Sequence, residues 1–402
     1  MGKNVVTSYT GGVNESIVVN IIRRQGPISR VDIAKLTGLT APTVTNISGR
    51  LIASGIISEC AEIGNEGKPI SGRPRILLKI NPEAANLIIV DIRSKEMTGY
   101  IVNAGLAIKE KVSVDLRKLE PEKVMAALEQ IINKCISSEL GQAVSAIGII
   151  VRGPVLHKEG ISLFSQSFGW QKVSLKFSLE QKFQLPVFVE NDMRAIALGA
   201  YYYGKYYGYK NAVMLGVGWG IGAGIFVNGQ LYRGISDIAG EIGHTIIDIH
   251  GPLCSCGKHG CLETFASEAA LVNSVVSAPN VNISLAAKLA DGDLSAILPE
   301  HIYEAAAKGD ELSIKMLQNI ARYLGVGVAN IINFLNPELI IIGGGIVRGR
   351  RFIEEILLQV ISEQTLDSTR SSVKVEYSAE GREAYMKGIA DVVLEGIFLT
   401  SR

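Results

Sequence analysis

Apolar residues recur along the first part of the chain with the spacing of short helices. Residues 14–24 carry them at helical intervals, and Gly26-Pro27 ends that segment. Ser29 is suited to cap a second helix that closes at Gly38, and a third helix begins at Pro42 after a tight turn. Two short helices joined in this way predict a helix-turn-helix, whose second helix enters the major groove of DNA.

Polar side chains near the start of the third helix are the candidates for contacts with bases. The first exposed positions of that helix are Thr43, Thr45 and Asn46, and Arg50 is assigned to DNA binding with them. Because a helix-turn-helix pattern alone has many false matches, the sequence that follows it has to agree with the assignment.

A β-wing is predicted directly behind the third helix. Residues 56–59 and 76–79 form its two strands, and the loop that joins them is polar and cationic. Arg73 and Arg75 flank Pro74, which restricts the backbone and presents both guanidiniums to phosphates or to an A·T-rich minor groove. A solvated basic loop is the alternative, but the position behind a helix-turn-helix favours DNA contact.

From residue 86 onward, short β-rich runs alternate with helices, and the alternation occurs twice. The first half is predicted to hold an antiparallel meander at 86–91, 98–103 and 108–114, a helix at 121–139, and strands at 146–151 and 186–190. The second half is predicted to hold strands at 213–216 and 222–227, a hairpin at Asn228-Gly229, several helices, and a strand at 339–342 that ends in Gly343-Gly344-Gly345. We therefore expect two α/β halves with a ligand-binding cleft between them.

Composition agrees with this organisation. A chain of 402 residues with 47% apolar and 20% charged residues is typical of a globular protein of two or three domains. The predicted domains are a winged helix-turn-helix at 1–82, an N-terminal lobe at 83–193 completed by a C-terminal helix at 382–402, and a C-terminal lobe at 194–381. The net charge of +1 is unevenly distributed, since basic residues outnumber acidic ones in residues 1–80. No signal peptide and no membrane-spanning apolar run are found, so we expect a cytoplasmic protein.

Three of the five cysteines are clustered with a histidine. One imidazole and three thiolates form a complete tetrahedral set for a structural Zn²⁺: His244, Cys254, Cys256 and Cys261. Reduced cysteines in a glycine-rich loop, or a disulfide between two of them, are the alternatives, and His250 and His259 are alternative imidazoles. Glu241 and Glu263 flank the set, so a metal there would also fix two acids beside a ligand pocket.

Four motifs occur in the order and form of one known family. They are Glu190-Asn191-Asp192, Gly-Glu-Ile-Gly-His at 240–244, Cys-x-Cys-Gly-x-x-Gly-Cys-Leu-Glu at 254–263, and Ile-Ile-Gly-Gly-Gly at 341–345. With these motifs essentially the whole chain resembles the ROK family, which contains sugar kinases and sugar-responsive repressors. The winged N-terminus is similar to that of the repressor branch.

The resemblance implies a duplicated α/β fold of the actin-like, ribonuclease-H-like kind, with zinc at the four ligands given above. It also implies that five side chains bind sugar hydroxyls: Asn191, Asp192, Glu241, His244 and Glu263. Carboxylates and amides suit a polyol because each forms several hydrogen bonds. For Asn191-Asp192, a helix N-cap after a strand is the structural alternative, and both roles can hold together.

The glycine-rich turns that cradle ATP phosphates in the kinases of this family are altered here. Where the kinases resemble Asp-x-Gly-Gly-Thr, the run 91–95 has Arg93 and Lys95, although these two cations could still attract a phosphate. Trp219 replaces a threonine of the second turn, and Asp192 corresponds to the base that acts on the sugar hydroxyl in the kinases. The glycines at 343–345 are interpreted as a packing relic. We therefore expect no enzyme activity, with an ATP-dependent sugar kinase as the alternative.

These patterns predict a sugar-responsive repressor of a carbohydrate-utilisation operon. It is expected to bind a palindromic operator as a homodimer or higher homo-oligomer, without a membrane partner. The runs at 231–236 and 251–257 resemble those of xylose repressors, which favours xylose as inducer over glucose or another aldose. A ligand that strengthens DNA binding is a further alternative. The tyrosines from Tyr201 to Tyr209 are assigned no function.

Overall fold

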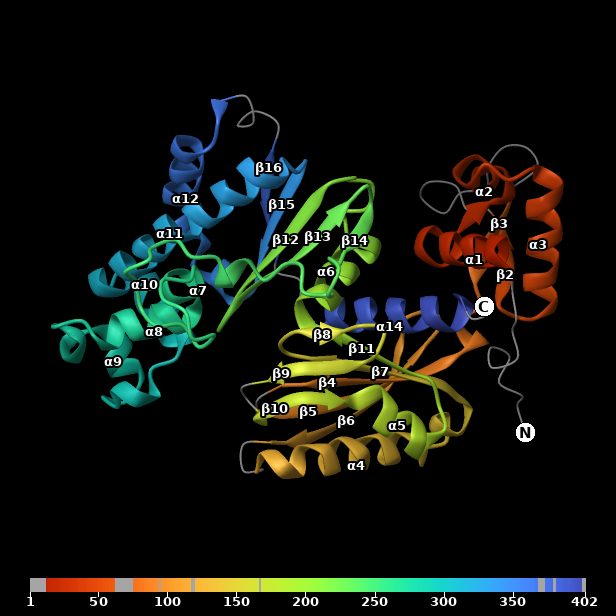
Figure 1. Cartoon of the computed structure of the whole chain (residues 1–402), viewed down its shortest axis with the longest axis horizontal. Helices are drawn as coiled ribbons and strands as arrows, with labels where there is room; N and C mark the ends of the chain where they lie inside the picture. Colours follow the sequence, from red (N-terminus) through yellow and green to blue (C-terminus); the bar gives the residue numbers. More distant parts are fainter. Residues whose placement is uncertain are drawn as a thin grey trace. The chain divides into compact units, whose positions relative to one another are not determined.

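The structure is a computed structural model that describes residues 12–61, 75–93, 95–116, 120–165, 168–367, 373–378 and 381–399. The chain divides into two compact units: unit 1 comprises Met1–Lys205 and Arg382–Arg402, and unit 2 comprises Tyr206–Gly381 (Figure 1). Within the described ranges, no helix is long and apolar enough to span a membrane. The division into three domains, with boundaries after residues 82, 193 and 381, remains a prediction.

Unit 1 begins with a small winged-helix module, called the reader below. Its elements are α1 (Val13–Gln25), β1 (Ile28–Ser29), α2 (Arg30–Thr37), α3 (Ala41–Ala53), β2 (Ile57–Ala61) and β3 (Ile76–Ile80). The three predicted helices and both wing strands are confirmed. The side chain of Ser29 caps α2 by accepting a hydrogen bond from the backbone N–H of Asp32, and Gly38 ends α2 with φ of 70°.

Strand β1 was not predicted from the sequence. It is only two residues long, and it pairs antiparallel with β3 to give the sheet order β1-β3-β2. A two-residue segment carries no periodic signal, and only its pairing partner makes it a strand. The apolar faces of the helices pack together in the reader, where Val18, Ile33, Val44 and Leu51 are fully buried.

The remainder of unit 1 is built on a five-stranded sheet of order β11-β7-β4-β5-β6. Its strands are β4 (Asn86–Ile92), β5 (Glu96–Asn103), β6 (Ile108–Asp115), β7 (Val144–Val151) and β11 (Val187–Asn191). The predicted antiparallel meander is confirmed, and β7 and β11 join it in parallel. A separate small sheet consists of β8 (Val155–Leu156), β9 (Ile161–Ser165) and β10 (Trp170–Ser174).

Helices cover both faces of the large sheet of unit 1 (Figure 1). They are α4 (Val124–Ile136), α5 (Leu175–Phe183), α6 (Asp192–Tyr203) and α14 (Arg382–Leu399). Ile88 and Val90 of β4 belong to the same core cluster as the apolar side of α4. Side chains alternate along a strand, so Ile89 points to the other face, where it lies with Ile389 of α14 beside Gly148. The C-terminal helix thus completes the core of a unit that starts at the other end of the chain.

Unit 2 repeats this architecture. Its strands are β12 (Ala212–Val217), β13 (Ile221–Val227), β14 (Gln230–Tyr232), β15 (Leu339–Gly343) and β16 (Lys374–Tyr377). Its helices are α7 (Glu263–Ala266), α8 (Glu268–Val276), α9 (Leu285–Leu289), α10 (Pro299–Ala307), α11 (Glu311–Leu335) and α12 (Arg350–Gln364). The sheet order β14-β13-β12-β15-β16 matches that of unit 1 read from its other edge, β6-β5-β4-β7-β11, with an antiparallel meander followed by two parallel strands. The duplicated α/β fold expected from the sequence is confirmed.

Candidate functional site

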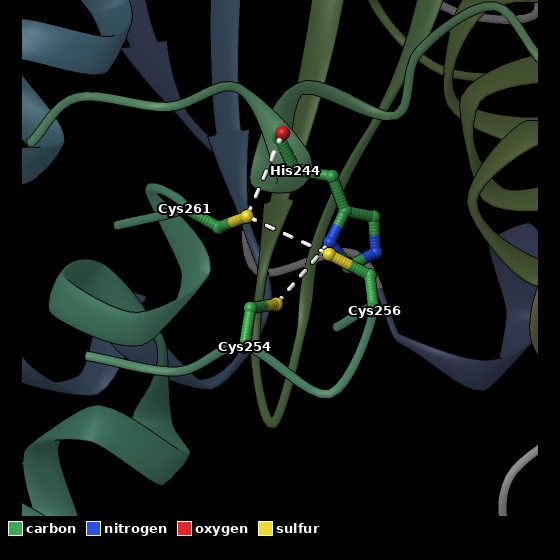
Figure 2. Close-up of side chains that lie close together, drawn as sticks. All are labelled: His244, Cys254, Cys256 and Cys261. Atoms are coloured by element: carbon green, nitrogen blue, oxygen red, sulfur yellow. Dashed lines mark hydrogen bonds between the residues drawn. The ribbon is translucent and has the colours of Figure 1, made fainter. Parts of the chain in front are cut away.

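A cluster of one imidazole and three thiols lies in unit 2 (Figure 2). The ligand atoms of His244, Cys254, Cys256 and Cys261 all lie within 4.8 Å of one another. The Sγ of Cys254 lies 3.5 Å from Nδ1 of His244, and the Sγ atoms of Cys256 and Cys261 are 3.7 Å apart. The predicted set therefore converges on one point, although its members span 18 positions of the sequence.

Backbone contacts hold the cysteine loop in this shape. The N–H of Cys254 donates to the carbonyl of Lys258 at 2.7 Å, and isolated bridges pair Ile246 with Cys261 and Leu253 with His259. Gly260 has φ of 72°, and a Cβ there would lie 1.4 Å from the carbonyl oxygen of Asp248. A glycine is thus required to bring the strand-like segments on either side of the loop together.

The donor set fits a zinc ion. A Zn–S distance of about 2.3 Å in a tetrahedron places two sulfurs about 3.8 Å apart, close to the separation of Cys256 and Cys261. That separation also excludes a disulfide between these two residues here, and all cysteines are free. His259 contacts the carbonyl of Gly251 with its Nδ1 at 3.1 Å and lies outside the ligand set, as does the exposed His250.

The two acids that flank the metal set have different local surroundings. Glu241 directly precedes the short 3-10 helix that carries His244. Glu263 is the first residue of α7, and its Oε2 accepts a hydrogen bond of 2.8 Å from the backbone N–H of Ile221. Glu263 therefore holds the glycine-rich turn at 218–222 in place through this hydrogen bond. Its position after the last cysteine did not suggest this role.

Asn191 and Asp192, which belong to unit 1, stand at the junction of β11 and α6. The Oδ1 of Asn191 accepts hydrogen bonds from the backbone N–H groups of Met193 and Arg194 at 2.9 and 3.1 Å, which confirms the predicted N-cap. Its Nδ2 donates to the carbonyl of Gly153 at 2.9 Å. The cap fixes the start of α6, and with it the position of the Asp192 carboxylate.

Two arginines and a tyrosine surround Asp192 in unit 1. Arg152 lies 3.7 Å from its carboxylate, and Arg93 donates to the neighbouring Asp91 at 2.8 Å and lies over the ring of Tyr385. Burial raises the pKa of Asp192, and Arg152 opposes that shift. Arg93 thus forms an internal ion pair at the position where the kinases of the family carry a glycine.

The predicted sugar-binding residues fall in both units. Asn191 and Asp192 lie together in unit 1, and Glu241, His244 and Glu263 lie in unit 2 around the metal set. The predicted sugar-binding residues of each unit therefore lie near one another within that unit. Their common role in binding sugar remains a prediction.

The predicted DNA-contacting side chains lie on α3 and beside the wing. Thr45, Asn46 and Arg50 are exposed and Thr43 is half-buried. Arg50 pairs with Glu15 of α1, so this guanidinium is held by the reader itself. Arg75 is exposed at the start of β3, whereas Arg73 and most of the wing loop lie outside the described residues.

Sequence reasoning missed Glu268, the first residue of α8. This buried carboxylate fills the space next to two glycine-rich turns: a Cβ on Gly345 would lie 1.9 Å from its Oε1, and one on Gly218 would lie 3.7 Å from its Oε2. Tyr303 donates to it at 2.9 Å, and its backbone N–H donates to the carbonyl of Gly218 at 2.7 Å. The signal was a lone acid at the start of an apolar run, five residues past the motif that ends at Glu263.

The carboxylate of Glu268 changes the chemistry of those turns. Backbone N–H groups in glycine-rich turns attract anions, but a negative carboxylate in the same space repels a phosphate. Burial raises the pKa of Glu268, while the hydrogen bond from Tyr303 opposes the shift.

Comparison with known proteins yields consistent matches. The ROK family matches residues 88–395, and a winged helix-turn-helix DNA-binding model matches residues 18–58. The chain is 31% identical over 386 residues to a xylose repressor of Caldicellulosiruptor bescii, covering 95% of each chain.

Solved structures extend the comparison to both branches of the family. A ROK family transcriptional regulator, a homologue of the Escherichia coli MLC protein, superposes with a TM-score of 0.80 at 30% identity and covers 96% of this chain and 97% of its own. A ROK family glucokinase from Streptomyces griseus, solved with glucose and AMPPNP, gives a TM-score of 0.67 at 29% identity and covers 77% of this chain and 99% of its own. The regulator thus matches almost the whole chain, whereas the kinase leaves about a quarter of it unmatched.

Proposed function

Because this chain belongs to the ROK family and carries a winged helix-turn-helix ahead of the family fold, we propose that it is a sugar-responsive transcriptional repressor of a carbohydrate-utilisation operon. One observation carries the proposal. A single chain joins α3, on which Thr45 and Asn46 are exposed, to the family fold, and a xylose repressor and a ROK family transcriptional regulator each match at least 95% of it. In such a protein the sugar changes the affinity for DNA only if it binds the DNA-competent and incompetent states unequally.

The reader is proposed to contact DNA in two places. Thr43, Thr45, Asn46 and Arg50 of α3 lie against bases or phosphates of the major groove, and Arg73 and Arg75 of the wing lie against the backbone or the minor groove. A homodimer would present two readers to the two halves of a palindromic operator. The net positive charge of the first 80 residues supports this assignment.

The sugar is proposed to be bound by Asn191, Asp192, Glu241, His244 and Glu263. Four of these side chains carry oxygen atoms that accept hydrogen bonds from hydroxyl groups, and the imidazole has one nitrogen free when the other binds a metal. Xylose is the proposed inducer because the chain is 31% identical over 95% of its length to a xylose repressor, and glucose is the alternative.

Zn²⁺ is the ion that we propose for the set of His244 and the three cysteines. When bound, it would supply a closed, structural cross-link without an open coordination position. The ligand residues tie the segment of Glu241 to the segment of Glu263, so the ion would keep both acids in place.

A sugar kinase is the second candidate, and Glu268 argues against it. Phosphoryl transfer requires close approach of nucleotide phosphates to glycine-rich turns, and this carboxylate lies next to two of them. The Glu268→Gly variant should bind ATP at least about tenfold more tightly than the natural chain, because a like charge is removed. Titration with a fluorescent ATP analogue measures the change; equal binding by both proteins would contradict this role of Glu268.

The proposed function is tested by titrating purified protein against duplex DNA from the region upstream of its own gene, with and without xylose, glucose and amino sugars. Fluorescence anisotropy should show tight, salt-dependent binding that one sugar weakens. A protein that ignores every fragment but consumes ATP in the presence of a sugar would be a kinase, and the repressor proposal would fail.

A further inference from the structure

The reader is fastened to the rest of unit 1 through a buried cluster of charges. Asp391 of α14 is fully buried and accepts hydrogen bonds from both guanidiniums at the end of α1. Arg24 reaches its two oxygens at 3.0 and 2.7 Å, and the hydroxyl of Tyr203 donates to it at 2.6 Å. Arg23 also donates to the Tyr203 hydroxyl at 2.7 Å. Three helices, α1, α6 and α14, therefore meet at one carboxylate.

Further contacts extend this junction along α14. Arg24 also pairs with Glu395 at 2.7 Å, and the hydroxyl of Ser16 donates to the carbonyl of Phe398 at 2.7 Å. The guanidinium of Arg24 lies 3.9 Å from the ring centroid of Tyr202. Two of the tyrosines left without a function by the sequence thus form part of the surface that receives α1.

The other end of α6 carries a residue that we propose to bind sugar. Asp192 is the first residue of α6 and Tyr203 is the last, and a helix of 12 residues spans about 18 Å. On α14, Tyr385 lies near Arg93 and within electrostatic range of Asp192, six residues before Asp391. Both helices therefore reach from the surroundings of Asp192 to the end of α1.

The two helices pack closely enough to move together. They lie side by side in unit 1 (Figure 1), and glycines mark the contact. A Cβ on Gly199 would lie 1.9 Å from the carbonyl oxygen of Ala384, and one on Gly388 would lie 1.7 Å from that of Ala195. Because backbone rests on backbone, no flexible side chain is available there to absorb a displacement.

We propose that α6 and α14 form a coupling element that transmits the state of the sugar site at Asp192 to the reader through the contacts of Asp391 and Tyr203 with α1. This inference rests on the proposed function, since it presumes that sugar reaches Asp192. Its physical basis is that a buried carboxylate shared by two guanidiniums and a phenol tolerates few alternative arrangements. A shift of α6 or α14 must therefore move α1 with it or break the junction.

The test compares Tyr203→Phe and Asp391→Asn with the natural chain. Operator affinity is measured by fluorescence anisotropy with and without D-xylose, or D-glucose if xylose does not bind, and sugar affinity by calorimetry without DNA. In the natural chain the sugar should change operator affinity at least about fivefold, the lower end of typical couplings. In both variants that ratio should fall below about twofold, while sugar affinity and sugar-free operator affinity stay the same. Glu354→Gln, which breaks the exposed pair with Arg350 in unit 2, is the matched control and should retain the full ratio.

The outcomes separate the two proposals. If sugar does not alter operator affinity in the natural chain, the proposed function fails first. If the natural chain responds and the variants respond equally, the coupling element is refuted while the repressor stands. A loss of sugar-free operator affinity in Tyr203→Phe would also refute it, because the junction would then only stabilise the reader. Should Asp391→Asn fail to fold, Tyr203→Phe decides the question, since it removes one hydroxyl and no charge.

Discussion

The close packing of α6 on α14 leads to a prediction about Gly388. In the Gly388→Ala variant, the new Cβ would lie 1.7 Å from the carbonyl oxygen of Ala195, about 2 Å closer than a favourable contact. The obstacle is backbone, so the helices have to separate. Overpacking of this kind costs about 3 kcal/mol, from which the better helix propensity of alanine recovers about 1 kcal/mol. The free energy of unfolding should therefore fall by about 2 kcal/mol.

Gly49 provides a matched control, because it lies inside α3 and a Cβ there would meet nothing within 4 Å. Gly49→Ala should stabilise the reader by about 1 kcal/mol. Differential scanning calorimetry should show a melting temperature lowered by about 4–8 °C for Gly388→Ala and raised by about 2–4 °C for Gly49→Ala. If the melting temperature of Gly388→Ala equals or exceeds that of the natural chain, the backbone contact between α6 and α14 does not exist.

Three further predictions address the metal, the DNA and the buried junction. Cys256→Ser should abolish bound zinc in elemental analysis, whereas Cys60→Ser on β2 should retain it; natural protein without zinc would contradict the assignment. Arg75→Ala should reduce the slope of log operator affinity against log salt by about 1 and leave sugar affinity unchanged; an unaltered slope would exclude a phosphate contact. Burial alone would raise the pKa of Asp391, but Arg23 and Arg24 outweigh burial and lower it from 3.8 to about 2, so its stabilisation is present above pH 4 and is lost as the pH falls toward 2. Denaturant titrations across that window should show a smaller loss of stability for Asp391→Asn, and an identical loss would argue against this ion pair.

The helix-turn-helix and the metal ligands of this protein could be predicted from short stretches of sequence. The helix-turn-helix follows from apolar spacing, the cap at Ser29 and the turn at Gly38, all of which act within a few residues of one another. The metal ligands follow from residue types that have few other reasons to cluster. Most strands of the duplicated sheets were predicted because each carries its own apolar run or alternation. Strand β16, with the sequence Lys-Val-Glu-Tyr, and the two-residue strand β1 were not predicted, because only pairing with a distant partner makes them strands.

Contacts between residues that are far apart in the sequence could not be predicted from such local patterns. The sequence around Glu268 does not single it out, and only the fold brings its carboxylate next to Gly218 and Gly345. Arg50 matched the pattern of a DNA contact, and the fold also pairs it with Glu15, a contact that its position in the sequence did not indicate. In each case the charge was visible in the sequence but its neighbours were not, because contacts between side chains that are distant in the sequence have no fixed spacing along the chain.

The parts of this protein follow from local sequence patterns: a reader, two α/β halves, and the residue types of a metal set. The attachment of the reader does not, because it depends on an arginine and an aspartate 368 positions apart. Helices and caps are stabilised by neighbours along the chain, whereas a buried ion pair forms only after folding has removed both groups from water and brought them into contact.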